Sequence, residues 1–162
     1  MNIKKIKGFT LIELIIVIAI IGLLAAALFV AIDPAKRIGD ANDAQRWADI
    51  TSILNGMLTY IADTATIPAS ISGMTADVYY MVGGPTSGTA EGCSEVSQGS
   101  ATATYTTRNI FSELVDKYLS TVPSDPGYTT STGYYIKRSA NNRITVGACI
   151  KQQATTSIEV QR

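Results

Sequence analysis

The most unusual chemical group in this sequence is a carboxylate, Glu13, that lies inside a long apolar stretch. Residues 9–32 are nearly all Leu, Ile, Val, Ala and Phe, and they follow a basic segment that contains Lys4, Lys5 and Lys7. As a helix this stretch would be about 36 Å long, enough to cross a hydrocarbon core of about 30 Å with the lysines on the cytoplasmic side. A carboxylate in such a span costs about 2.5–3.5 kcal/mol at the helix centre and usually marks a functional site. The sequence therefore predicts a membrane span in which Glu13 marks a functional site.

No group of residues in the sequence forms a recognisable catalytic or metal site. The chain has no histidine, the commonest general base and metal ligand. We also find no Gly-rich phosphate loop, nucleophile elbow or paired metal motif. The 13 basic and 13 acidic residues cancel, and without the three lysines of residues 1–8 ten basic residues face thirteen acidic ones. This charge offers no large basic face for duplex DNA, so we expect no enzyme, no cofactor and no specific nucleic-acid partner.

Three interpretations account for the apolar stretch. A secretory signal peptide is one, but its apolar region would have only 7–15 residues, and residues 31–34 (AIDP) make a poor cleavage site. A plain single-span anchor is another, and it leaves Glu13 unexplained. The third rests on residues 8–13 (GFTLIE), which follow a basic leader and open the apolar run. This combination resembles the processing motif of type IV pilins and pseudopilins.

The resemblance implies a specific maturation pathway. Residues 1–8 would be a leader, prepilin peptidase would cut between Gly8 and Phe9, and the new N-terminal Phe9 would be methylated. The precursor would cross the cytoplasmic membrane once, with its N-terminus inside and its head outside. An inner-membrane platform and an assembly ATPase would then build an extracellular helical filament of identical subunits. In this family the acid at Glu13 meets the N-terminal amine of an adjacent subunit; the alternative is an acid that merely lies among the headgroups near the lysines.

A long helix must position these groups. Residues 9–32 are expected to form its hydrophobic transmembrane or filament-core half, and residues 33–63 its amphipathic half. Gly22 and Pro34 are its soft points, because members of the family have a Gly and a Pro here and the backbone between them can extend in a filament. Pro34 comes four residues later than in the best-known members. The alternatives are a simple kink, or a restarted helix that Asp33 caps and Pro34 begins.

The second half of this helix carries an apolar stripe with helical spacing. The predicted stripe consists of Trp47, Ile50, Leu54, Met57, Leu58 and Ile61. Trp47 is expected to begin the core of the head, and the charged residues 40, 43, 46 and 49 to lie mostly off the stripe. One helix over residues 9–63 would be about 80 Å long. Its apolar half would need a bilayer or neighbours of the same kind, which favours assembly.

The rest of the chain, residues 64–162, predicts a globular head. Residues 85–100 form a surface loop rich in Ser, Gly and Thr, and residues 109–120 a short amphipathic helix. Residues 76–82 predict a strand or a short loop crossing. The other predicted strands are 101–107, 133–139, 143–150 and 155–160, with a hairpin turn at 140–142. The expected fold is therefore α+β, a long N-terminal helix packed on a small C-terminal antiparallel β-meander, and it resembles the pilin fold.

The head contains three further candidate features. Cys93 and Cys149 favour a disulfide that ties the loop to the hairpin if the head is extracytoplasmic; two free buried thiols are the alternative. Asp125, near Gly127, would suit a calcium site such as some pseudopilin heads contain, but a turn is the better interpretation because Ca²⁺ takes six to eight oxygens. Five tyrosines form either a contact surface for glycans or DNA, or part of the core. They are Tyr79, Tyr80, Tyr128, Tyr134 and Tyr135.

The sequence thus favours a structural protein, the subunit of a type IV pilus, and a major pilin over a minor one because Glu13 is present and the head is small. The first alternative is a pseudopilin or minor pilin of a type II secretion or DNA-uptake machine, which shares the same N-terminus. An alternative from another class is a membrane-anchored binding module whose helix is only a tether. Motility, adhesion, DNA uptake and secretion all use subunits of this design.

Overall fold

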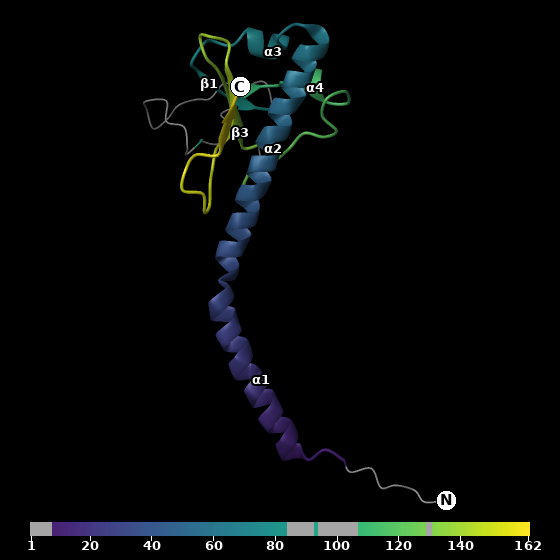
Figure 1. The fold of residues 1–162 in the computed structure, drawn as a ribbon, viewed down its shortest axis with the longest axis vertical. Coiled ribbons are helices and arrows are strands. Elements are labelled where there is room, and N and C mark those ends of the chain that lie inside the picture. The colour runs from purple at the N-terminus through teal and green to yellow at the C-terminus, as the bar shows by residue number, and fades with distance from the viewer. Residues whose placement is uncertain (1–7, 84–92, 94–106, 129–130) are drawn as a thin grey trace, which may run out of the picture. The chain divides into compact units, whose positions relative to one another are not determined.

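The computed structural model describes residues 8–83, 93, 107–128 and 131–162 (Figure 1). The loop predicted at residues 85–100 lies outside this part of the chain except for Cys93, as does the strand predicted at 101–107 except for its last residue. The chain divides into two compact units, residues 1–38 and residues 39–162. Each unit is described by itself.

The N-terminal unit is helical. Helix α1 spans Leu11–Ile32 and helix α2, which begins here and continues into the second unit, spans Pro34–Thr64. Helix α1 is rich in Leu, Ile and Ala and contains no proline, a composition that suits a helix. No residue of α1 is buried. The predicted long helix is therefore confirmed, with one interruption at Asp33.

Helix α2 buries one face in the second unit, but this face differs from the predicted stripe. Ile50, Leu54 and Met57 are buried as expected. The prediction that Trp47 and Leu58 belong to the buried stripe is wrong, because these residues remain 40% and 38% exposed. The buried line instead begins with charged residues and runs through Asp43, Arg46, Ile50, Ile53 and Met57. A spacing of three and four residues fits more than one line along a helix. The line that contains Asp43 and Arg46 is buried because the head supplies hydrogen-bond partners for both side chains.

A five-stranded sheet forms the other layer of this unit, in the order β2-β1-β3-β4-β5. The strands are β1 (Tyr79–Val82), β2 (Thr107–Arg108), β3 (Tyr134–Arg138), β4 (Ile144–Ala148) and β5 (Glu159–Gln161). β1, β3, β4 and β5 pair antiparallel, and β2 adds a short parallel edge to β1. The predicted β3–β4 hairpin is confirmed, and its turn closes through the Asn142 N–H, which donates to the Ser139 carbonyl at 3.0 Å. The parallel edge was not predicted.

The helix predicted at residues 109–120 is wrong in length. Helix α4 covers only Phe111–Leu114, and the chain then turns so that Tyr118 and Leu119 both donate backbone N–H groups to the Leu114 carbonyl. The turn buries Leu119 against α2, where the absent side chain of Gly56 leaves room for it. The remaining helix, α3 (Ala69–Ser72), begins where the Glu113 carboxylate accepts two backbone N–H groups. Tertiary packing thus overrides the local helical pattern.

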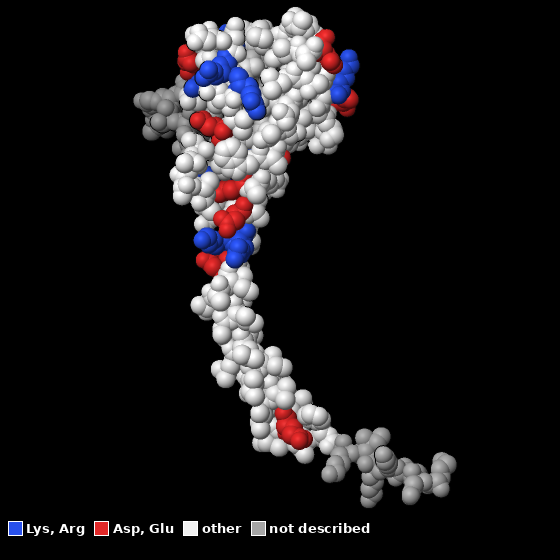
Figure 2. Space-filling model, in the orientation of Figure 1, with Lys and Arg blue, Asp and Glu red and all other residues white. Residues whose placement is uncertain are grey.

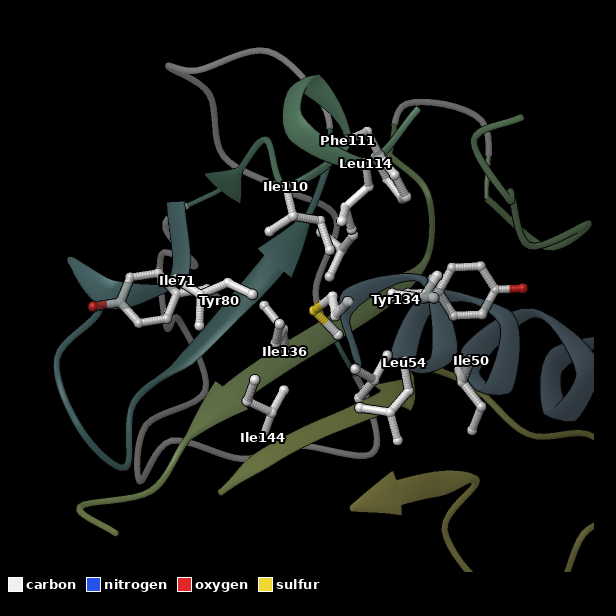
Figure 3. Close-up of a cluster of buried hydrophobic side chains, with 14 of the residues drawn as sticks. Ile50, Leu54, Ile71, Tyr80, Ile110, Phe111, Leu114, Tyr134, Ile136 and Ile144 are labelled. Atoms are coloured by element: carbon white, nitrogen blue, oxygen red, sulfur yellow. The ribbon is translucent and has the colours of Figure 1, made fainter. Parts of the chain in front are cut away.

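The hydrophobic core lies between α2 and one face of the sheet (Figure 3). Ile50 and Leu54 come from α2, and Tyr134 and Ile136 come from the facing side of β3. Alternate residues of a strand point to opposite faces, so Tyr135, between Tyr134 and Ile136 in β3, points to the far face of the sheet. A second buried cluster lies on that face. That cluster contains Met81, Cys93, Tyr135 and Cys149. Both faces of the sheet are therefore covered.

Candidate processing and assembly site

The segment at the predicted cleavage position leads directly into a capped helix. Gly8 and Phe9 precede α1, and the Phe9 side chain is 81% exposed. Thr10 is the N-cap residue, and its hydroxyl accepts the Glu13 N–H at 3.3 Å. In return, Glu13 Oε2 accepts the Thr10 N–H at 2.8 Å and the Thr10 hydroxyl at 2.7 Å. This reciprocal arrangement is a capping box, which satisfies N–H groups that have no partner within the helix.

Helix α1 exposes its apolar side chains along its whole length. Apart from Glu13 near its beginning, the helix contains no charged residue, and in Figure 2 its surface is correspondingly uncoloured. By length and composition, the helical region Leu11–Thr64 contains the one candidate membrane span among the described residues. Twenty-two residues of exposed apolar helix are not stable in water, since soluble proteins rarely expose apolar patches larger than a few hundred Å². The helix therefore requires either a bilayer or other helices around it.

The two predicted soft points of the helix differ in their geometry. Gly22 lies within the regular part of α1, and no atom outside the helix backbone lies within 4 Å of the position that a Cβ would take. At Asp33 the backbone adopts φ 44°, a left-handed conformation that ends α1. Asp33 Oδ1 then accepts the Lys36 N–H at 3.3 Å, and Pro34 is the first residue of α2. The structure therefore has a restarted helix at Pro34, one of the alternatives that the sequence left open.

Cys93 and Cys149 form a disulfide, with their Cα atoms 4.5 Å apart. Cys149 follows β4 directly and is fully buried. Its Sγ lies 3.5 Å from the Sδ of Met81 in β1. The bond therefore joins Cys93 to the far face of the sheet, and the pairing that the even number of cysteines predicted is present.

Asp125 belongs to a buried ion-pair cluster in which both of its carboxylate oxygens accept hydrogen bonds. Arg46 Nε and Nη2 donate to its two oxygens at 2.5 Å and 2.9 Å, and the Gly127 N–H donates to Oδ1 at 2.7 Å. The turn that the sequence favoured at this position is present, since Tyr128 also donates its N–H to the Asp125 carbonyl. The described residues contain no group of three potential metal ligands. A calcium site at Asp125 therefore finds no support in this geometry.

Arg46 joins Asp125 to a second carboxylate, Asp43, whose Oδ1 lies 2.7 Å from Nη1. The Asp43 carboxylate also accepts three successive backbone N–H groups, from Gln152, Gln153 and Ala154, at 2.6 to 3.0 Å. Burial acts to raise the pKa of Asp43, but the three N–H groups and Arg46 together lower this pKa below its ordinary value. The hydrogen bonds of Arg46 with Asp125 and Asp43 outweigh burial and raise the pKa of the guanidinium. The cluster holds α2 to the loops on either side of the β3–β4 hairpin.

The five tyrosines are distributed between the core and its margin. Tyr80, Tyr134 and Tyr135 are buried, whereas Tyr79 and Tyr128 are half-buried. Burial and a 2.6 Å hydrogen bond to Asp49 raise the pKa of Tyr134. Tyr135 lies across Gly147 on the far face, and its hydroxyl reaches Glu159 at 2.9 Å. Three of the five tyrosines therefore belong to the buried interior, one of the two alternatives that the sequence left open.

Two features of the structure were not predicted from the sequence. The capping role of Thr10 was readable from the spacing Thr-x-x-Glu before an apolar run. The buried pairing of Asp43 and Arg46 had a weaker signal, the i, i+3 placement of opposite charges in line with Ile50 and Ile53. The second partner of Arg46, Asp125, lies 79 residues away from it in the sequence, so no local pattern predicts it.

Comparison with protein-family models gives one match. Residues 3–29 match the prokaryotic N-terminal methylation motif, so the match includes Gly8, Phe9, Glu13 and most of α1. No curated protein and no solved structure matches the chain. The one apolar N-terminal helix among the described residues fits a membrane-anchored precursor. The motif is the signal of type IV pilins, and it indicates a substrate of the type IV pilin-like and pseudopilin class.

Proposed function

We propose that this chain is the structural subunit of a type IV pilus, cleaved between Gly8 and Phe9, methylated on Phe9 and polymerised through α1. The observation that carries this proposal is an apolar helix without a single buried residue that coincides with the methylation motif. In the membrane, lipid covers this helix before assembly. In a filament, the same surface is covered by helices of other subunits.

The geometry at Glu13 is compatible with the proposed charge pair. Only Oε2 is engaged in the capping box, and among the described residues Oε1 accepts no hydrogen bond. Oε1 is therefore free to meet the N-terminal amine of a neighbouring subunit, which cleavage would create at Phe9. A pair of opposite charges in an apolar surrounding is favourable only when both partners are present, so this contact would set the axial position of each added subunit.

The proposal includes the remaining partners and a conformational step. Prepilin peptidase would process and methylate the precursor, and an inner-membrane platform with its assembly ATPase would extract identical subunits from the membrane into an extracellular filament. The backbone between Gly22 and Pro34 would extend during this step. Two observations support this extension: the interruption of the helix at Asp33 and the open space around Gly22.

The intact mass of the protein in material sheared from the cell surface tests the proposal. We expect the mass of residues 9–162 plus one methyl group, with a gain of two hydrogens when the Cys93–Cys149 disulfide is reduced. A chain that still begins at Met1, or that occurs only in membranes, would contradict it and favour the anchored binding module. A correctly processed chain that is present in traces, in fibres made of another subunit, would instead favour the pseudopilin or minor pilin.

A further inference from the structure

A row of polar side chains crosses the far face of the sheet, beside the buried cluster that contains the disulfide. Lys137 lies two residues after Tyr135 in β3, so its side chain points to the same far face. Its direct partners are Tyr79 in β1 and Thr145 in β4, and Thr145 in turn pairs with Gln161 in β5. Directly opposed residues of paired strands have Cβ atoms about 4.5–5.5 Å apart. These residues of four neighbouring strands therefore form one continuous row, which we name the far-face row: Tyr79, Lys137, Thr145 and Gln161.

Two cations belong to this surface, and neither pairs with a carboxylate among the described residues. Lys137 Nζ lies 4.9 Å from the centroid of the Tyr79 ring and donates to the Tyr79 hydroxyl at 3.4 Å. Arg143, immediately before β4, is exposed, and its Nη1 lies 3.5 Å from the amide oxygen of Gln161. The ion pairs between described residues both lie in the buried cluster around Arg46. The charges of Lys137 and Arg143 are therefore available to an anion.

Thr145 adds an unpaired polar atom in the middle of the row. The residue is 4% exposed, and its Oγ1 has no hydrogen-bond partner within the described part of the chain. Buried polar groups nearly always have a partner, so an exception calls for an explanation. The neighbouring Lys137 and Gln161 side chains are long and can adopt other rotamers, so a ligand that displaces them reaches this hydroxyl. The row thus contains a hydrogen-bonding group that a ligand can satisfy.

The polar groups of this surface match a sugar that carries a carboxylate. The ammonium of Lys137 and the guanidinium of Arg143 can form charge-assisted hydrogen bonds with a carboxylate. The hydroxyl of Thr145 and the amide of Gln161 can both donate and accept hydrogen bonds, as sugar hydroxyls require. A surface that combines two cations with neutral groups of this kind fits a ligand in which a charge and several hydroxyls occur together.

A dense polyanion such as a polyphosphate fits this surface less well. Glu159 lies two residues before Gln161 in β5, on the same face, and its Oε2 accepts the Tyr135 hydroxyl at 2.9 Å. A carboxylate at this position can accept sugar hydroxyls, but it repels a second negative group. Without the three lysines of residues 1–8, the chain has thirteen acidic and ten basic residues, so it repels closely spaced negative charges as a whole.

We propose that the far-face row and Arg143 together bind a saccharide that carries a carboxylate. Arg143 lies diagonally opposite Lys137 across β3 and β4, with about 7–8 Å between the two positions, so one carboxylate can accept hydrogen bonds from both cations. Thr145 and Gln161 then bond to hydroxyl groups of the same sugar. The site lies entirely on the head, so this inference goes beyond the proposed filament function and does not depend on it.

Binding of defined probes to the detergent-solubilised full chain tests the class of ligand. The probes are trigalacturonate, its trimethyl ester, which keeps the sugars and removes the charges, and tripolyphosphate, which carries dense charge without sugar hydroxyls. By isothermal titration calorimetry we expect trigalacturonate to bind about tenfold more tightly than either of the others, because only it engages both the cations and the neutral groups. Equal binding of the acid and its ester would overturn the role of the cations, and tighter binding of tripolyphosphate would overturn the choice of a saccharide.

Three substitutions test where the saccharide binds. Arg143→Gln removes a cation of the site, and Lys117→Gln removes an exposed cation in the turn after α4 as the matched control. Thr145→Val replaces the unpaired hydroxyl by a methyl group of similar size, so it should keep the stability of the fold and weaken binding. We expect trigalacturonate affinity to fall about fivefold or more in Arg143→Gln and Thr145→Val, and to stay unchanged in Lys117→Gln. Unchanged affinity in either site variant, or an equal loss in the control, would overturn the inference.

Discussion

At the scale of single residues, the charges that lie in unusual places all have defined partners. Glu13 caps the helix that carries it, and Arg46 holds two carboxylates that no other cation approaches within the described residues. A buried charge without a partner costs several kcal/mol, so such groups are retained only where the fold or the assembly supplies one. Three predictions separate the roles of these charges.

The first concerns Glu13, whose capping and assembly roles can be separated by two variants. Glu13→Gln keeps an oxygen that can accept the Thr10 N–H but removes the charge, whereas Glu13→Ala removes both. If the carboxylate pairs with a neighbouring amine, we expect both variants to lose surface fibres while their precursors remain in the membrane. The measurement is the amount of the protein in sheared fibres relative to membranes. Normal fibre formation by Glu13→Gln would show that capping, not charge, is the essential role.

The second concerns Arg46. Arg46→Met leaves the carboxylates of Asp43 and Asp125 buried without their cation, which typically costs about 3–5 kcal/mol of unfolding free energy. The control is Arg143→Met, which removes an exposed guanidinium and should change stability by no more than about 0.5 kcal/mol. Urea unfolding of the two variants and the wild type measures the difference. Similar stabilities of both variants would contradict the assigned role of the cluster.

The third concerns pH. Because the folded state lowers the pKa of Asp43, the ionised carboxylate stabilises the fold above its unfolded pKa of about 4, and this contribution is lost as the pH falls through the lower folded value. We expect the stability difference between the wild type and Asp43→Asn to be constant from pH 7 to pH 5 and to shrink below about pH 4. Unfolding free energies measured across this range test the sign. A difference that persists unchanged at pH 2 would contradict it.

At the scale of elements, α2 has two faces of different character. Its buried line mixes charged residues with Ile50, Ile53 and Met57, whereas none of its exposed residues between 41 and 62 is charged. The sheet that faces the inner line is covered on its far side as well, where the disulfide anchors Cys93 to the end of β4. The contribution of this disulfide to the stability of the head can be measured.

Reduction of the Cys93–Cys149 disulfide should destabilise the head. The two cysteines are separated by 56 residues, and closing a loop of this length contributes about 4 kcal/mol in the chain-entropy model. Chemical unfolding with and without reductant measures this difference. The double variant Cys93→Ser with Cys149→Ser is the control, because its stability should not respond to reductant. An unchanged unfolding midpoint of the reduced wild type would contradict the prediction.

At the scale of the whole molecule, the two compact units have different solvent requirements. The unit of residues 39–162 contains its own core, the complete sheet and the ion-pair cluster, whereas residues 8–38 bury nothing within the chain. We expect a fragment of residues 39–162 to be soluble and folded without detergent, with its disulfide formed, and the full chain to require detergent. Size-exclusion chromatography and circular dichroism test this expectation. A fragment that aggregates or lacks regular structure would show that the head depends on α1.

The sequence by itself determined about the first fifth of this protein, residues 1–32. The apolar run, the basic leader and the acid at Glu13 are local in sequence, so composition and spacing were enough to predict α1, the membrane span and the resemblance that the methylation motif supports. The β3–β4 hairpin was predictable for the same reason, because a turn at residues 140–142 brings neighbouring strands together. The even number of cysteines predicted their pairing, which the structure confirms.

Only the tertiary structure decided which face of α2 is buried and how the head is closed. The burial of Arg46 depends on Asp125, and that of Asp43 on the backbone of residues 152–154, so the contacts that stabilise these charges are more than 75 residues distant in the sequence. The early end of α4 depends on the space beside Gly56, and the parallel pairing of β2 on the position of β1. Local periodicity can show that a helix has an apolar line, but the partners in the rest of the fold determine which line is energetically favourable to bury.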